Sequence, residues 1–346
     1  MSNPEISILI ITHNQKILLE RCLDSVLSQR IEVPYEIIVS DDGVDDGTKD
    51  YIQQLNGSEQ VSGIKNLVEF KYIYCNSDEC SPLNLAQRIG WNRLTAYKQA
   101  RGKYFVNVDA DDFLVGTDLY QEEYEMLENH PECSMVQTHL LFMDDGDSID
   151  KVKVGYPFNE KLKTGVVFSL EDVLRYGLRG QHQTYMYRRR PQDDMEEILG
   201  CRFDDTNITY YHLQYGSVVF LNITGYVWVQ HPNNSSRRYK YDDHKTRLLP
   251  LHFATLFKDS KYTFLRLGIR KMWDVIATAP VYPRLSEERR IACSKSPAFI
   301  CRFYSENRHG IYSWCRYRLI WLLLGMMKHF RLETKAWLDL LYWLMI

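Results

Sequence analysis

The stretch Tyr104-Phe105-Val106-Asn107-Val108-Asp109-Ala110-Asp111-Asp112 puts three carboxylates directly after an apolar run. The apolar run predicts a β-strand, and residues i and i+2 of extended backbone point the same way. We therefore expect Asp109 and Asp111 to face one ligand. Carboxylates suit a hard divalent cation such as Mg²⁺ or Mn²⁺, and a cation held by so few protein groups keeps sites free for a diphosphate. The alternative for so short a motif is a solvated acidic turn.

The segments before this stretch alternate between strand and helix patterns. Ile6 to Ile11 is a continuous apolar run, as in buried parallel strands, and apolar residues recur at helical spacing from Leu18 to Leu27. The expected strands are residues 6–11, 36–40, 70–74 and 104–108, and the expected helices are residues 18–27 and 85–100. This order predicts an α/β fold with a doubly wound, mostly parallel sheet flanked by helices.

Polar residues follow three of the expected strands, at positions 12–14, 41–43 and 109–112. In open α/β sheets, ligands bind beyond the carboxyl ends of the strands. The three clusters are therefore candidate binding residues that the fold brings together. For Asp41 and Asp42 the alternative is a turn that caps the helix after Gly47.

Taken together, these segments resemble the family 2 glycosyltransferases of the GT-A fold, of the kind that build bacterial surface glycans. Order and spacing agree over roughly the first 120 residues. The segments that carry the resemblance are Ile8 to Asn14, Cys22 to Gln29, Glu36 to Thr48, Gly102 to Tyr104, and Asp109 to Asp112.

The resemblance implies a nucleotide-sugar donor and assigns roles to the polar clusters. Asp41 would accept a hydrogen bond from the base, the ring of His13 would stack on the base, and Asp109 would approach the ribose. A carboxylate is able to read the imide N–H of uracil, and an imidazole supplies a flat face. The remaining donor-binding candidates of these clusters are Thr12, Asn14 and Asp42.

The same resemblance implies that Asp111 holds Mn²⁺ or Mg²⁺, with Asp112 as the alternative ligand if the chain turns one residue later. The chain departs from the family at Asn92-Arg93-Leu94, where members usually carry Ala-Arg-Asn. Arg93 keeps the arginine that we expect near the donor diphosphate, and Arg88 competes for that role. The alternative for either arginine is a solvated helix position.

Beyond the acidic run the pattern predicts strands over 133–143, 217–222 and 226–230, and a short helix over 168–176 behind the N-cap candidate Ser169. Between them lies Phe203-Asp204-Asp205. By resemblance, this acidic pair supplies the catalytic base, with Asp205 as the first choice and Asp204 as the second. An inverting transfer needs a carboxylate that faces the acceptor hydroxyl. The alternative is simple N-capping of the next helix.

Gln230-His231-Pro232-Asn233-Asn234-Ser235 resembles the segment that ends the family's catalytic domain. His231 is therefore a candidate contact to the metal or the diphosphate, although a histidine after a strand also has ordinary structural roles. We expect a catalytic domain over 1–250 and a helical extension over 251–346.

Composition excludes several other classes of protein. The 346 residues carry a net charge of −3 and no basic stripe through the first 230 positions, so nucleic acid is not an expected partner. The 8 cysteines form no C-x-x-C pair, which argues against zinc or a disulfide framework. Gly43 to Lys49 is one residue short of a Walker phosphate loop. Residues 1–5 are polar, which predicts a cytoplasmic protein without a signal peptide.

The expected C-terminal extension is apolar and basic. Leu319 to Met327 and Ala336 to Ile346 are both shorter than the roughly 20 apolar residues that cross a bilayer. Cationic and aromatic residues lie in and around these runs: Arg302, Arg308, Trp314, Arg316, Arg318, Trp321, Lys328, Arg331, Lys335, Trp337 and Trp343. Such a pattern favours amphipathic helices on the anionic inner face of the cell membrane, and the alternative is helices that pack as core or against a second subunit.

The sequence thus predicts a metal-dependent, inverting glycosyltransferase that moves a sugar from a UDP-sugar or another nucleotide-diphosphate donor to a hydroxyl of a surface glycan or lipid-linked glycan. One alternative is a non-catalytic nucleotide-sugar-binding or membrane scaffold protein. Another is a sugar-nucleotide pyrophosphorylase, which would need a glycine-rich loop and a lysine after the first strand. Ile11-Thr12-His13-Asn14 offers neither.

Overall fold

A computed structural model of the chain describes residues 3–43, 45–75, 83, 85–155, 162–169, 172, 182–191, 193–200, 203–213, 215–232 and 234. All of them belong to one compact unit, Met1–Asp243. The expected helical extension over 251–346 lies outside the described residues.

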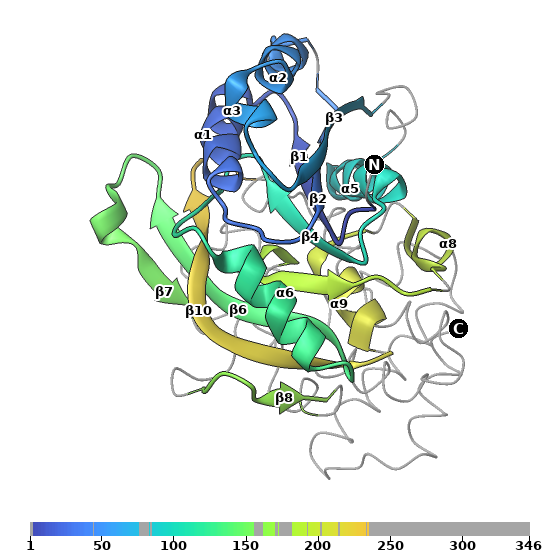
Figure 1. Ribbon diagram of the computed structural model, residues 1–346. Helices are drawn as coiled ribbons and strands as arrows, with labels where there is room; N and C mark the ends of the chain where they lie inside the picture. The colour runs from blue at the N-terminus through green and yellow to red at the C-terminus, as the bar shows by residue number, and fades with distance from the viewer. Residues whose placement is uncertain are drawn as a thin grey trace, which may run out of the picture. The chain divides into compact units, whose positions relative to one another are not determined.

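The first half of the unit alternates strands and helices, as the sequence predicts (Figure 1). Its strands pair in the order β3-β2-β1-β4, and each of these neighbouring pairs is parallel. The carboxyl ends of the strands therefore meet at one edge. The elements are β1 (Ile6–Thr12), α1 (Lys16–Leu27), β2 (Tyr35–Asp41), α2 (Thr48–Asn56), α3 (Glu59–Ser62), β3 (Leu67–Tyr74), α5 (Leu85–Gln99) and β4 (Tyr104–Asp109).

The second half continues the same sheet in the order β9-β6-β10-β5. β9 runs antiparallel to both β4 and β6, whereas β6 and β10 are parallel. The α/β class is confirmed, and parallel pairing dominates only up to β4. The elements are β5 (Phe113–Leu114), α6 (Leu119–Asn129), β6 (Cys133–Asp144), η1 (Ile149–Lys151), β7 (Lys153–Gly155), β8 (Val167–Phe168), η2 (His182–Thr184), β9 (Tyr185–Arg188), α8 (Met195–Leu199), α9 (Asp205–Leu213) and β10 (Ser217–Gln230).

Residues 217–230 form one long strand, so the prediction of two strands was wrong. Phe220 pairs with Gln137 and Thr224 pairs with His139, so three residues of β10 (221–223) oppose one residue of β6 (138). Such an excess makes a bulge, which bends a strand without ending it. The polar residues between the two apolar runs belong to this bulge.

The expected helix over 168–176 begins later than predicted. Phe168 lies in β8, where it pairs with β10. Ser169 acts as the predicted cap, because its hydroxyl accepts a hydrogen bond from the backbone N–H of Asp172 at 3.2 Å, and Asp172 is helical. The rest of this segment, apart from Asp172, lies outside the described residues.

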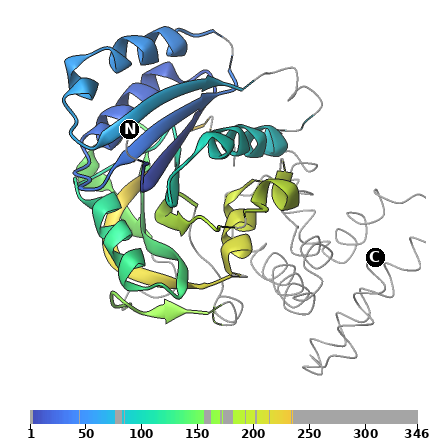
Figure 2. The ribbon, with the colours of Figure 1, turned by 45° about the vertical axis from the view of Figure 1, so that its right-hand side comes forward.

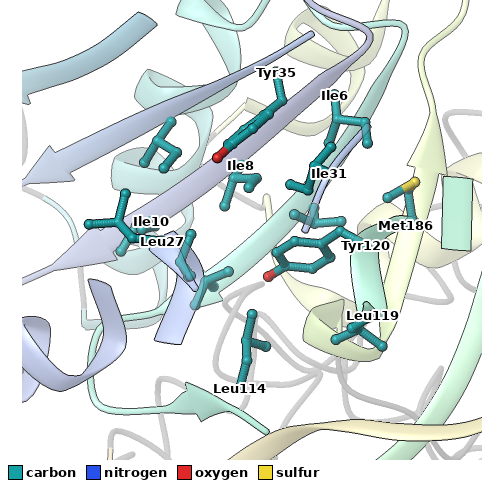
Figure 3. Close-up of a cluster of buried hydrophobic side chains, with 14 of the residues drawn as sticks. Ile6, Ile8, Ile10, Leu27, Ile31, Tyr35, Leu114, Leu119, Tyr120 and Met186 are labelled. Carbon is teal, nitrogen blue, oxygen red and sulfur yellow. The ribbon is translucent and has the colours of Figure 1, made fainter. Parts of the chain in front are cut away.

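The main core lies between the sheet and the helices that cover it. Alternate residues of β1 (Ile6, Ile8 and Ile10) point to the same side and pack with Leu27 and Tyr120 (Figure 3). Each such buried aliphatic side chain contributes roughly 1.5–3 kcal/mol. α5 packs on β1 and β2 and lies across the sheet from α1, α2 and α3 (Figure 2). This helix brings its polar side chains toward the carboxyl edge of the sheet.

Candidate active site

The carboxyl edge of the sheet gathers the three polar clusters that the sequence singles out. Thr12 at the end of β1 pairs with Asp41 at the end of β2. On the other side of β1, Ile11 pairs with Asp109 at the end of β4. The predicted binding residues therefore lie side by side because three parallel strands end together.

Asp41 is a buried carboxylate at this edge. One of its oxygens accepts a hydrogen bond from the N–H of Gly43 at 2.9 Å, and the other accepts one from the hydroxyl of Tyr72 at 3.1 Å. Burial raises the pKa of Asp41, and these two hydrogen bonds oppose that shift. Tyr72 is a site residue that sequence reasoning missed.

Asp42 points into a network of basic and amide groups. Its carboxylate accepts hydrogen bonds from Nδ1 of His13 at 3.0 Å and from Nδ2 of Asn92 at 3.4 Å. Arg88 lies 3.5 Å from its other oxygen. The hydrogen bond to Asp42 raises the pKa of His13, whose ring is half-exposed. Asp42 thus orients His13, which borders solvent together with the exposed Asn14.

Asp109 is held from two directions. Nη2 of Arg93 donates to one carboxylate oxygen at 2.8 Å, and Nε2 of Gln183 donates to the other at 2.5 Å. Arg93 is buried, and Arg88 contacts Asp42 instead. The two arginines that competed in the sequence therefore have separate carboxylate partners.

Asp111 lies next to the segment that follows β10. Its Oδ2 accepts hydrogen bonds from Nε2 of His231 at 2.9 Å and from Nδ2 of Asn234 at 3.4 Å. Burial and the nearby charge of Asp109 raise the pKa of Asp111. The structure brings His231 and Asp111 together across 120 residues of sequence. Asn234 is a second residue that sequence reasoning missed.

Asp112 occupies a different environment from Asp111. It is fully buried, and it accepts hydrogen bonds from the hydroxyl of Tyr226 and from the N–H of Val229, the latter at 2.8 Å. Burial, followed by the charges of Asp111 and Asp109, raises its pKa well above the usual range. Asp112 therefore fastens the acidic run to β10.

The acidic run has the donor set of a divalent-cation site. One oxygen each from Asp109, Asp111 and Asp112 lies within 4.8 Å of the others. Carboxylates crowded in this way raise one another's pKa, and a divalent cation relieves the repulsion. Each oxygen of Asp112 accepts a hydrogen bond, and so does each oxygen of Asp109. His231 and Asn234 both donate to Oδ2 of Asp111, so Asp111, through Oδ1, is the carboxylate whose surroundings fit a metal ligand best.

A stability measurement tests whether Asp112 has a structural role, as its hydrogen bonds to β10 indicate, or is a metal ligand like Asp111. Asp112→Ala should lower the free energy of unfolding by about 2–5 kcal/mol, because it leaves two buried donors of β10 without an acceptor. Tyr226→Phe, which removes one donor, is expected to cost less. Urea denaturation followed by circular dichroism measures both. An Asp112→Ala protein of normal stability would make the metal-ligand role of Asp112 the better explanation.

The acidic pair Asp204 and Asp205 lies at the start of α9, and both side chains are partly exposed. The carbonyl of Asp204 accepts from the N–H of Ile208 at 2.9 Å, and the carbonyl of Asp205 accepts from the hydroxyl of Thr209 at 2.7 Å. α9 packs against η2, which carries Gln183. Asp204 and Asp205 therefore lie on a helix that packs against η2, and Gln183 of η2 donates a hydrogen bond to Asp109.

Comparisons with known proteins agree with the fold and with the sequence motifs. Residues 7–163 match the model of glycosyl transferase family 2. No curated protein matches the chain. Among solved structures, the chain is similar to S. aureus TarS 1–349 in complex with UDP, with 14% identity, a TM-score of 0.54, and coverage of 95% of this chain and 92% of that chain. It is also similar to TarS 1–349 in complex with UDP-GlcNAc, with 15% identity, a TM-score of 0.57, and coverage of 99% and 90%. At these identities the likeness concerns the fold.

Proposed function

Because the chain is a glycosyltransferase with a family 2 domain over residues 7–163, we propose that it transfers a sugar from a nucleotide-diphosphate donor to a hydroxyl of a surface glycan or lipid-linked glycan. The observation that carries this proposal is the meeting of Asp41, Asp109 and Asp111 at one edge of the sheet. In the proposed complex Asp41 would contact the base, Asp109 the ribose, and Asp111 the metal ion on the diphosphate.

A uridine nucleotide is the donor that we favour. Asp41 is an acceptor-only group when ionised, and the imide N–H of uracil is a donor of matching chemistry. The half-exposed ring of His13, held by Asp42, offers a flat face next to it. The TarS structures of similar fold contain UDP and UDP-GlcNAc. These observations support UDP-sugar as the donor class.

Mn²⁺ or Mg²⁺ would be held by Asp111, with His231 beside it. When bound, such a cation neutralises charge on the departing diphosphate. Asp205 accepts the proton of the acceptor hydroxyl while its oxygen forms a bond to the anomeric carbon. The bond from that carbon to the diphosphate oxygen breaks, and the nucleoside diphosphate leaves. Attack opposite the leaving group inverts the anomeric configuration, and Asp204 is the second choice of base.

A ligand screen tests this proposal. UDP and UDP-sugars should raise the melting temperature more than GDP or ADP, because bound ligand stabilises by RT ln(1 + [L]/Kd), about 2.7 kcal/mol at 100 Kd. Asp41→Ala should remove the preference for uridine. Slow hydrolysis of the stabilising UDP-sugar with Mn²⁺ would separate an enzyme from a non-catalytic binding protein. If no nucleotide stabilises the protein, the proposed function is wrong.

We propose that residues 1–250 are the catalytic domain and that the helical extension over 251–346 holds the enzyme on the cytoplasmic face of an anionic membrane. The support is the pattern of short apolar runs flanked by cations and tryptophans. In the part of the chain that the structure describes, no helix has the length and apolar character needed to cross a membrane.

The membrane proposal predicts a dependence on surface charge. Full-length protein should sediment with vesicles that contain anionic lipid more than with neutral vesicles, and high salt should release only part of it. Replacing Lys328, Arg331 and Lys335 by glutamate should weaken sedimentation, whereas Lys49→Glu on the exposed face of α2 should not. Protein that stays in the supernatant with both vesicle types would contradict the proposal and favour helices that pack as core or against a second subunit.

A further inference from the structure

Gln183 makes a contact that the sequence motifs do not anticipate. It lies in η2, 74 residues after Asp109, and its Nε2 donates to Oδ2 of Asp109 at 2.5 Å. Arg93 donates to Oδ1 of the same carboxylate. A carboxylate only accepts hydrogen bonds, so the NH₂ end of the Gln183 amide must face Asp109. The orientation of the amide is thereby fixed by chemistry.

We propose that Gln183 is a positioning residue for the transfer reaction: it fixes Asp109 for the donor and connects the donor edge to the helix that begins at Asp205. This inference rests on the proposed function and deepens it. Gln183 acts through Asp109 and η2 and does not itself touch the reacting atoms.

The surroundings of Gln183 indicate that stability alone does not explain this glutamine. Its side chain is 5% exposed, and its Oε1 is buried without a hydrogen-bond donor. An orphaned buried acceptor is unfavourable, and an apolar residue of similar shape would avoid it. The contact to Asp109 is therefore the physical reason for an amide at this position.

The neutral charge of Gln183 also suits the site. Arg93 already supplies one positive charge to Asp109. A second cation at position 183 would cancel the negative charge that Asp109 and Asp111 present to a divalent ion. An amide directs the carboxylate without changing the net charge. Gln183 thus orients Asp109 while the acidic run keeps its attraction for a cation.

The connection to the acceptor side runs through η2. This short helix packs against both β4 and α9. It is fastened by Thr138, whose hydroxyl donates to the carbonyl of Thr184 at 3.4 Å. β9 continues from η2, and the hydroxyl of Tyr187 lies 3.2 Å from that of Thr209 in α9. Asp109 and the helix of Asp205 are thereby held by the same short segment.

Gln183→Met tests the proposal, because methionine keeps the length and removes the donor. The expected result is a rise of about tenfold in the KM for the UDP-sugar, equivalent to about 1.4 kcal/mol of binding free energy, because Asp109 loses one of the donors that orient it. kcat for hydrolysis should change less than about threefold, and the melting temperature should not fall. Gln183→Asn, whose shorter amide does not reach Asp109, should show the same rise in KM.

Gln29→Met is the matched control. Gln29 is also buried, its Nε2 donates to the carbonyl of Gly116 at 2.8 Å, and its Oε1 is likewise without a donor. It makes no hydrogen bond to Asp109, Asp111 or Asp112. The inference is overturned if Gln29→Met raises KM as much as Gln183→Met, or if both Gln183 variants keep the KM of the wild type.

UDP binding by the wild-type protein distinguishes a failure of the Gln183 inference from a failure of the proposed function. Calorimetric titration of UDP, with and without Mn²⁺, accompanies the kinetics for each protein. A wild type that binds UDP alongside variants with unchanged affinity overturns only the role of Gln183. A wild type that binds no nucleotide overturns the proposed function and this inference together.

Discussion

Asp205→Asn is expected to lower turnover by about 10²–10⁴, the range that general acid–base catalysis contributes, while the affinity for the donor stays nearly unchanged. The amide keeps the size of the side chain but does not take up the proton of the acceptor hydroxyl. Asp205 is partly exposed at the first residue of α9.

Release of UDP from the best-binding UDP-sugar, with a glycan acceptor, measures the turnover, and calorimetry with UDP measures donor affinity. Asp204→Asn is the matched control one residue away. If Asp204 caps α9, its replacement by alanine should cost about 0.5–2 kcal/mol of stability with little effect on turnover. Near-normal turnover in Asp205→Asn would remove Asp205 from the mechanism, and a loss confined to Asp204→Asn would reverse the assignment.

The fold was predictable from sequence where local pattern decides it. All seven residues of β1 are buried, and a strand covered on both faces reads as a continuous apolar run. The prediction failed at β10, because a bulge and a turn both insert polar residues between apolar runs. The distinction depends on pairing with β6, which is a long-range contact without a local signal. The reversal of strand direction at β9 is of the same kind.

Some residues of the candidate site were likewise predictable from the local sequence pattern, and others were not. Asp41, Asp109 and Asp111 follow strands and were found from their position. Tyr72 and Gln183 were missed because they reach the site from 31 and 74 residues away in the chain. Neither belongs to a motif of its own, so only the folded structure identifies them.

The choice between Asp111 and Asp112 as the candidate metal ligand also depended on the folded structure. The N–H of Asp112 donates to the carbonyl of Asp109 at 3.0 Å, so the chain turns immediately after β4. The turn directs Asp112 into the interior, where Tyr226 and Val229 meet it. From sequence alone, a turn one residue later would have exchanged the two roles. The metal-ligand assignment of Asp111 stays a prediction.

Asp111→Asn is expected to abolish most of the Mn²⁺-dependent gain in UDP affinity. The amide keeps the shape of the side chain and removes the charge that a hard cation requires. Stability should change little or rise, because burial and Asp109 already disfavour the ionised form of Asp111. His231→Gln should weaken the same gain less, since His231 contacts Asp111 as a neighbour.

The measurement is a titration of UDP at several Mn²⁺ concentrations for wild type, Asp111→Asn and Tyr226→Phe, with melting temperatures recorded in parallel. Tyr226→Phe is the control, because it disturbs the hydrogen bonds of Asp112 without touching Asp111. The metal enhancement should disappear in Asp111→Asn and persist in Tyr226→Phe. An equal enhancement in Asp111→Asn and wild type would exclude Asp111 as a ligand, and would leave the donor diphosphate to be neutralised by protein cations, of which Arg93 beside Asp109 is one candidate.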